Sequence, residues 1–211
     1  MTTIDDVMTY WFGEPAADVA GLERKFKRWY LGGASEDAVL VERFGAAVEQ
    51  ALAGALDGWA ATPRGRIALI LLLDQMTRSV FRDRARAFTG DPKAQKLAVE
   101  ALDTHMEAQL SFEERQFLLM PLLHAESVQL LERFCVEVQR HVDAAPEWTR
   151  KMLSAGLEQG PKYLDVIRRF GRFPHRNQAL GRVSTPEELA FLEDWTKRAK
   201  PRAAEELLEK G

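Results

Sequence analysis

The chain has 211 residues, of which 46% are hydrophobic and 29% charged, and its formal net charge is −3 at pH 7. This composition is typical of a folded globular protein and excludes a disordered or fibrous chain. The longest uninterrupted apolar run, 67–73, is far shorter than the roughly 20 residues that a transmembrane helix needs, so no membrane span is predicted.

The N-terminal segment MTTIDDVMTYWF carries acidic residues where a secretory signal needs basic ones, and it has the pattern of a first helix. We therefore expect a cytoplasmic protein. The one cysteine, Cys135, lies in an apolar stretch, so neither an internal disulfide nor a cysteine-based zinc site is predicted. No cofactor and no metal is expected, and the sequence indicates no particular oligomeric state.

Signals for the start of a helix recur along the chain, whereas no strand pattern stands out. The dipeptides Thr-Pro at 62–63 and 185–186 and Asp-Pro at 91–92 each combine an N-cap residue with a proline at the first helical position. Ser111 and Thr185 also begin capping boxes, because a glutamate follows each of them three residues later. The expected helices span residues 3–12, 22–31, 36–56, 63–80, 92–108, 112–120, 122–142, 147–170, 176–181 and 186–198.

Many short helices joined by short turns predict an all-α protein of stacked antiparallel helix pairs. No Gly/Ser-rich linker marks a boundary, so we expect one helical domain over residues 1–198 and a fraying C-terminal tail over 199–211. Ser35 is expected to begin the helix over 36–56, and Pro121 to kink or divide the helical run near residue 120. Whether Gly160-Pro161 divides a helix stays open.

The segment GRIALILLLDQMTRSVFR is apolar on every side over 67–73, so this helix is expected to be central and buried. Asp74 and Gln75 follow directly, Arg78 comes one turn later, and Arg82 one turn beyond that. A buried charge needs a partner, because an unpaired one costs several kcal/mol. Two interpretations stay open: Asp74 and Arg78 neutralise each other at positions i and i+4, or Asp74 orients Arg78 towards a pocket.

Arginine outnumbers lysine and is concentrated in two parts of the chain. Composition alone favours a GC-rich genome as the cause of the high arginine content. Because the arginines are clustered, bidentate recognition of a carboxylate or phosphate stays an alternative. The first cluster comprises Arg78, Arg82, Arg84 and Arg86, and the second comprises Arg168, Arg169, Arg172, Arg176 and Arg182.

The second cluster surrounds the stretch RFGRFPHRN, which has the pattern of a helix end. The helix over 147–170 is expected to stop at Phe170, with Gly171 in the left-handed conformation and Pro174 where no helix can continue. Such stop signals explain the glycine, the proline and some of the arginines without any ligand.

The stop signals do not explain Arg172, His175, Arg176 and Asn177, which lie in the turn itself. Turns on a rigid scaffold commonly present side chains to ligands, although Asn177 can equally cap a short helix. The neighbouring arginines disfavour the charged form of His175, which suits a neutral, hydrogen-bonding or general-base imidazole. If Arg176 binds a ligand, Arg176→Ala is expected to abolish anion binding and to change stability little.

The segment MPLLHAESVQ offers His124 and Glu126. On a regular helix these two side chains point about 200° apart, at 100° per residue, so they cannot share a metal ion unless Pro121 distorts the turn. His124 is interpreted either as a satisfied core residue or as a proton carrier, and Glu126 as an ion-pair partner for the arginine-rich turn. The catalytic candidates are therefore His175, His124, Asp74 and Glu126.

Four segments, WFGEP, LLLDQMTRSVFRDRARAF, MPLLHAES and RFGRFPHRNQALGRVSTPEE, together resemble a bacterial family of uncharacterised proteins, domain of unknown function 924. The similarity extends over about residues 5–195. The resemblance implies an all-α fold in the tetratricopeptide-like class of right-handed superhelices, and no established activity. Where the family pattern is roughly LDQFPRNIFRG, this chain has LDQMTRSVFRD, which retains Asp74, Gln75, Arg78 and Arg82.

Three functions are compatible with these observations. The favoured one is binding of a small anionic ligand or an acidic peptide in a pocket lined by arginine and histidine. The second is an enzyme that acts on a small carboxylate or phosphate with histidine as general acid or base. RNA binding comes third, because the acidic balance opposes it. The predicted ligand-binding residues are Asp74, Gln75, Arg78, Arg82, Arg172, His175, Arg176 and Asn177.

These residues can form one site only if the end of the central helix meets the turn after Phe170. No nucleophile elbow, phosphate loop, HExxH motif or dinucleotide fingerprint indicates a particular reaction.

Overall fold

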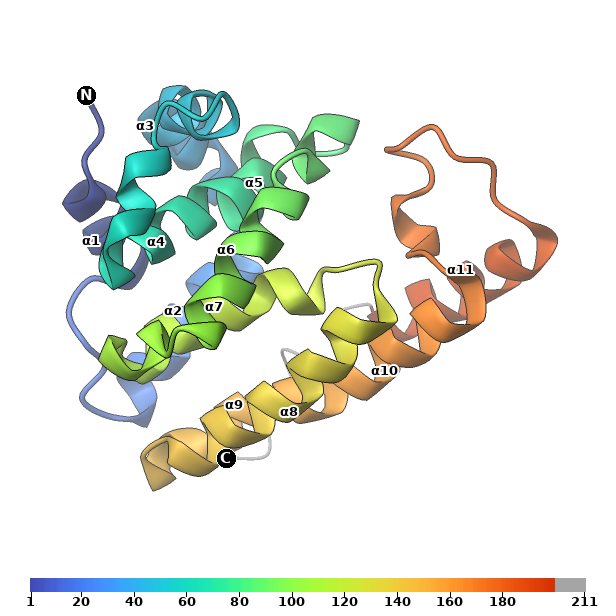
Figure 1. The fold of residues 1–211 in the computed structure, drawn as a ribbon. Coiled ribbons are helices and arrows are strands. Elements are labelled where there is room, and N and C mark those ends of the chain that lie inside the picture. The colour runs from blue at the N-terminus through green and yellow to red at the C-terminus, as the bar shows by residue number, and fades with distance from the viewer. Residues whose placement is uncertain (200–211) are drawn as a thin grey trace.

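The computed structural model describes residues 1–199, and the regular secondary structure within them is helical (Figure 1). Within that range no strand is present, and no helix is long and apolar enough to cross a membrane. The α-helices are α1 (Ile4–Phe12), α2 (Val19–Leu31), α3 (Gly33–Leu52), α4 (Pro63–Ile70), α5 (Thr77–Val80), α6 (Asp91–Asp103), α7 (Phe112–Leu123), α8 (Val128–Ala144), α9 (Arg150–Leu153), α10 (Ala155–Phe170) and α11 (Pro186–Ala199).

Short segments of other helical geometry connect them. Five are 3₁₀ helices, namely η1 (Asp57–Ala61), η3 (Ala85–Phe88), η4 (Met106–Gln109), η5 (Glu147–Thr149) and η6 (Pro174–Arg176). The segment η2 (Leu71–Met76) is a π-helix that continues α4 into α5.

Three of the predicted helix starts are confirmed by their capping hydrogen bonds. Thr62 caps α4 by accepting from the Gly65 amide at 3.1 Å, and α4 begins at a proline. The Ser111 capping box is complete at the start of α7. At the start of α11 the amides and side chains of Thr185 and Glu188 bond each other reciprocally, at 2.8 and 3.1 Å.

Two starts predicted from capping residues are wrong, and the helix expected over 122–142 begins only at Val128. Helix α3 begins at Gly33, so Ser35 lies inside it and donates its hydroxyl to the Gly32 carbonyl at 3.0 Å instead of capping the helix. Helix α6 is capped by Gly90, and Asp91 is its first helical residue. The Asp91 carboxylate is bound by two arginines, Arg78 and Arg176.

Neither internal proline divides its helix. Pro121 lies inside α7, which continues to Leu123, and Pro161 lies inside an unbroken α10. A proline removes one backbone hydrogen bond, which tertiary packing can offset. At Gly160 the absence of a side chain lets α10 approach α8, since a Cβ there would lie 3.0 Å from both the Cys135 sulfur and the Phe134 ring.

The hydrophobic core surrounds the central helix, as predicted. Every side chain from Ile67 to Leu73 is fully buried. The connected core extends from Val7 in α1 to Phe173, just after α10. Figure 1 shows α8 and α10 side by side and running in opposite directions, in agreement with their extensive contacts.

This arrangement supports the all-α class, whereas the right-handed superhelix and the single domain over 1–198 stay predictions. Of the C-terminal tail predicted over 199–211, everything after Ala199 lies outside the described residues.

The helix end at RFGRFPHRN is confirmed. Gly171 ends α10 in the left-handed conformation, with φ 68° and ψ −1°, and its amide donates to the Ile167 carbonyl at 2.8 Å. No atom lies within 4 Å of a Cβ built on Gly171. The positive φ, rather than lack of space, is therefore what requires glycine at this position.

We predict opposite effects for the same substitution at two glycines. Gly171→Ala forces alanine into the left-handed conformation and should lower the free energy of unfolding by about 1 to 2 kcal/mol. Gly45→Ala, inside α3 and also without a neighbour within 4 Å of the added Cβ, should raise it by about 0.5 to 1 kcal/mol. Urea denaturation of both variants measures the difference. Stability changes of the same sign would contradict this explanation of the turn.

Candidate functional site

A π-helical segment replaces one α-helical turn in the middle of the predicted helix over 63–80. In η2 the backbone hydrogen bonds reach one residue further than in an α-helix, and such segments occur frequently at functional sites. The segment contains Asp74, whose side chain is fully buried. Next to it, the Thr77 hydroxyl donates to the Leu73 carbonyl at 2.9 Å.

The Asp74 carboxylate lies at the centre of several hydrogen-bond donors. His124 Nδ1 lies 2.8 Å from Asp74 Oδ1 and 3.0 Å from Oδ2. Gln75 donates its amide to Oδ2 at 2.5 Å, and Arg78 Nη2 lies 3.5 Å from Oδ1. Burial opposes ionisation of Asp74, but the charge and hydrogen bond of His124, together with the charge of Arg78, outweigh it and hold the pKa below its ordinary value. Asp74 is therefore an ionised hydrogen-bond acceptor.

Asp91 joins the central helix to the turn after α10. Its Oδ1 accepts from Arg78 Nη2 at 2.6 Å, and its Oδ2 accepts from Arg176 Nη1 at 3.1 Å. Arg176 also donates to the His124 carbonyl at 2.9 Å. Both guanidinium groups lie over the ring of Phe88, at 4.7 and 4.8 Å from its centre. The predicted meeting of the two segments is thus present, through the carboxylate of Asp91, for which the sequence pattern predicts only a helix cap.

We call Asp74, Arg78, Asp91, His124 and Arg176 the charged cluster. Burial raises the pKa of Asp91, and the charge of Asp74 adds to this effect, whereas Arg78 and Arg176 oppose it. Two carboxylates face two guanidinium groups, so the cluster is close to neutral when the imidazole is uncharged. Only two members reach the surface appreciably, since the side chains of Arg78 and His124 are each 23% exposed.

Gly90 brings Asp91 close to the π-helix. A Cβ at Gly90 would clash with the carbonyl oxygen of Leu73, so only glycine lets the two backbones come this near. The glycine of the tripeptide Gly-Asp-Pro at 90–92 is therefore required by a close approach of two backbones, which an interpretation as a helix cap does not include.

Two other residues predicted from RFGRFPHRN, Arg172 and Asn177, lie outside the charged cluster and bind Glu188, near the start of α11. Arg172 binds both oxygens of Glu188, at 2.7 and 2.8 Å, and these bonds lower the pKa of Glu188 to about 2. Asn177 is buried and donates to the Ser184 hydroxyl at 3.0 Å and to Glu188 at 3.3 Å. These contacts fasten the turn to the start of α11.

Glu126 is an ion-pair partner in the turn, as expected, although its arginine is Arg182. The two side chains bond through both oxygens at 2.8 Å, and Glu126 also accepts from the Phe173 amide at 2.8 Å. His175 stacks on Trp195, with ring centres 6.1 Å apart and planes 8° apart. The residue as a whole is exposed, yet desolvation of the imidazole and the charge of Arg176 lower its pKa to about 4, so the imidazole is neutral.

Arg82 lies outside the charged cluster. It pairs through two nitrogens with Asp37 of α3, at the surface. Among the remaining histidines, His105 is exposed, whereas His141 is only 5% exposed and burial lowers its pKa to about 4.

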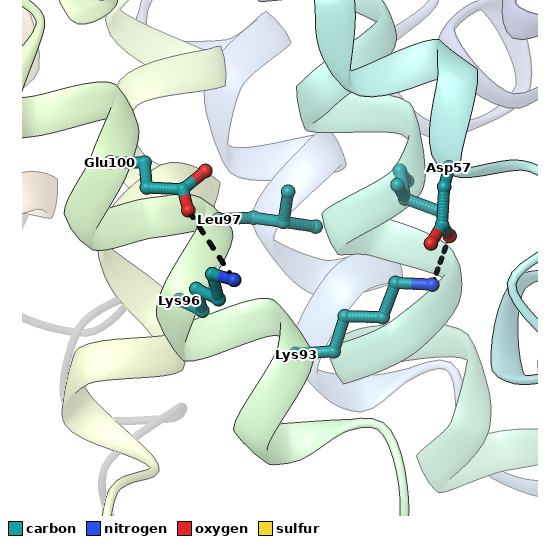
Figure 2. Close-up of a pocket in the computed structure, with 6 residues that line it drawn as sticks. Asp57, Lys93, Lys96, Leu97 and Glu100 are labelled. Carbon is teal, nitrogen blue, oxygen red and sulfur yellow. Dashed lines mark hydrogen bonds and ion pairs between the residues drawn. The ribbon is translucent and has the colours of Figure 1, made fainter.

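A separate hollow of about 160 Å³ lies between η1 and α6 (Figure 2). It is lined by Asp57, Leu69, Lys93, Lys96, Leu97 and Glu100. Figure 2 shows Lys93 directed at Asp57, with which it forms an ion pair, and Lys96 lies 3.9 Å from Glu100. None of these residues belongs to the charged cluster. Across residues 1–199, no group of three or more His, Cys, Asp or Glu side chains is arranged to hold a metal ion.

The sequence pattern of a family described as "Bacterial protein of unknown function (DUF924)" matches residues 7–195. The chain belongs to this family. A solved structure of a protein of unknown function from Agrobacterium tumefaciens is similar, with 32% identity and a TM-score of 0.69, over 84% of this chain and 99% of that one. The curated proteins include no match to the sequence. The comparisons thus support the family and the fold, and they assign no activity.

The buried position of Arg176 changes the expectation for its removal. Its side chain is 8% exposed and paired with Asp91, so Arg176→Ala leaves a buried carboxylate short of a partner and should destabilise by about 3 to 5 kcal/mol. Arg82→Ala removes an arginine that also pairs with an aspartate but is 55% exposed, and should cost less than about 1 kcal/mol. Chemical denaturation compares the two. Similar small losses would show that Arg176 is not structural.

Proposed function

We propose that this protein binds a small anionic ligand, carrying a carboxylate or a phosphate group, at the exposed edge of the charged cluster. The observation that supports this proposal is the shared contact of Arg78 and His124 with one oxygen, Asp74 Oδ1, at 3.5 and 2.8 Å. The guanidinium and the imidazole therefore lie side by side, and each is 23% exposed. The guanidinium donates hydrogen bonds to anions, and the imidazole does so through Nε2 when it is protonated.

The buried carboxylates fix the direction of these donors. Arg78 Nη2 contacts both Asp74 and Asp91, Nη1 donates to the Ala87 carbonyl, and the ring of Phe88 lies against the guanidinium. Donors that are already fixed lose little conformational entropy when a ligand binds, which favours affinity. Because the carboxylates also neutralise much of the charge, we expect recognition to depend on the placement of N–H groups more than on net attraction.

The distribution of ion pairs favours a small ligand over an acidic peptide. Apart from Arg84, each arginine of the two clusters already pairs with a carboxylate. The surface pairs are Arg82–Asp37, Arg86–Glu49, Arg168–Glu132, Arg169–Glu187, Arg172–Glu188 and Arg182–Glu126. An extended polyanion would meet a surface on which the positive charges are balanced locally. The same balance, with the net charge of −3, opposes RNA binding.

A second candidate function is catalysis on such a ligand. The bond from His124 Nδ1 to Asp74 favours it, because an imidazole held by a carboxylate is a common general acid–base group.

Binding is tested by titrating inorganic phosphate and sodium succinate into the wild type and two lysine variants, with calorimetry and thermal shift as readouts. Arg78→Lys keeps the charge and loses the planar fork, so we expect at least about tenfold weaker binding, the equivalent of one charge-assisted hydrogen bond.

Arg86→Lys is the matched control, since Arg86 also pairs with a carboxylate and lies over a phenylalanine ring, and its affinity should be unchanged. Circular dichroism confirms that both variants are folded. Absence of binding by the wild type, or equal affinities in both variants, would contradict the proposal.

A further inference from the structure

The tautomer of His124 follows from its partner. Asp74 is ionised and can only accept hydrogen bonds, so Nδ1 of His124 carries a hydrogen and donates it. In the neutral ring Nε2 then holds a free lone pair. Nδ1 lies within hydrogen-bond distance of both Asp74 oxygens, at 2.8 and 3.0 Å, which fixes the plane of the ring. The side chain is 23% exposed, so solvent reaches the ring.

The surroundings of His124 leave water as the nucleophile. Among the side chains described within residues 1–195, no hydroxyl, thiol or amine hydrogen-bonds to its ring, and Nδ1 is bonded to Asp74. The nearest hydroxyl of the π-helix, that of Thr77, donates to the Leu73 carbonyl. His175, the other candidate base, stacks on Trp195. No carboxylate of the described residues bonds to its ring, so nothing orients it as Asp74 orients His124.

We propose that His124 is the general base of a hydrolase for carboxylic esters that carry an anionic group, with Asp74 as a positioning residue. This inference rests on the proposed function, because Arg78 would hold the anionic group of the ester beside the imidazole.

In the step, a water molecule gives a proton to Nε2 of His124 while its oxygen forms a bond to the ester carbonyl carbon. The bond from that carbon to the leaving oxygen then breaks, and the imidazolium returns the proton to the leaving oxygen. An acid and an alcohol are released, and neither an oxidant nor a second substrate is needed. Asp74 stays ionised, holds the ring in the productive tautomer and stabilises the transient imidazolium.

The reaction is tested with 4-carboxyphenyl acetate, an ester that bears a carboxylate and releases 4-hydroxybenzoate, which absorbance detects. We expect the wild type to hydrolyse it above the background rate, and His124→Ala to lower kcat by about 100-fold or more. Added imidazole should restore part of the lost activity in His124→Ala, an effect that a purely structural role of the histidine would not produce. His105→Ala, which removes an exposed histidine, should have the wild-type rate.

Two further variants separate the roles. Asp74→Asn should lower kcat while leaving KM nearly unchanged, whereas Arg78→Lys should mainly raise KM. If Asp74→Asn does not fold, His124→Ala with and without imidazole decides the question alone.

The outcomes also distinguish this inference from the proposed function. Anion binding that depends on Arg78, without turnover or with turnover that is indifferent to His124, overturns the hydrolase and leaves the binding site standing. If the wild type neither binds anions nor hydrolyses the ester, the proposed function and this inference are both overturned.

Discussion

The buried carboxylate of Asp91 is the contact on which the site depends. It binds Arg78 from the central helical run and Arg176 from the turn after α10, two residues nearly a hundred positions apart in the sequence. Removing one partner of a buried ion pair leaves an uncompensated charge and costs about 3 to 5 kcal/mol. Replacing the whole ion pair by hydrophobic residues of the same volume can nevertheless leave the stability unchanged. The charges are therefore not needed for stability as such. What they provide is a defined position for each donor.

The local geometry that brings these groups together has two causes. The π-helical segment η2 carries Asp74 into the core beside the end of α7, where His124 meets it. Gly90 allows the start of α6 to approach the backbone of that segment at Leu73, and Asp91 follows directly. Four elements, η2, α5, α6 and η6, together with the residue that follows α7, thus supply one cluster. The outer edge of that cluster, formed by Arg78 and His124, is the only part with appreciable exposure among its five members.

Local signals were sufficient to predict much of the fold from the sequence. Capping residues located the starts of α4, α7 and α11, and the left-handed Gly171 located the end of α10, because these features depend on a few neighbouring residues. The apolar run 67–73 identified the central helix for the same reason. Asp91 shows where such signals fail. Its position before a proline is typical of an N-cap, but two distant arginines compete more strongly for its carboxylate.

The candidate site was predicted only in part. Asp74, Arg78 and Arg176 do come together, whereas Arg172, Asn177 and Arg82 bind carboxylates elsewhere. The pairing of His124 with Asp74 was missed, since which charged group meets which depends on helix packing and on the widened turn at η2. A double-mutant cycle on Asp91→Ala and Arg176→Ala, followed by chemical denaturation, tests the central bridge most directly. We predict a coupling energy of about 2 kcal/mol or more, whereas losses that add to within about 0.5 kcal/mol would show that Asp91 does not join the two segments.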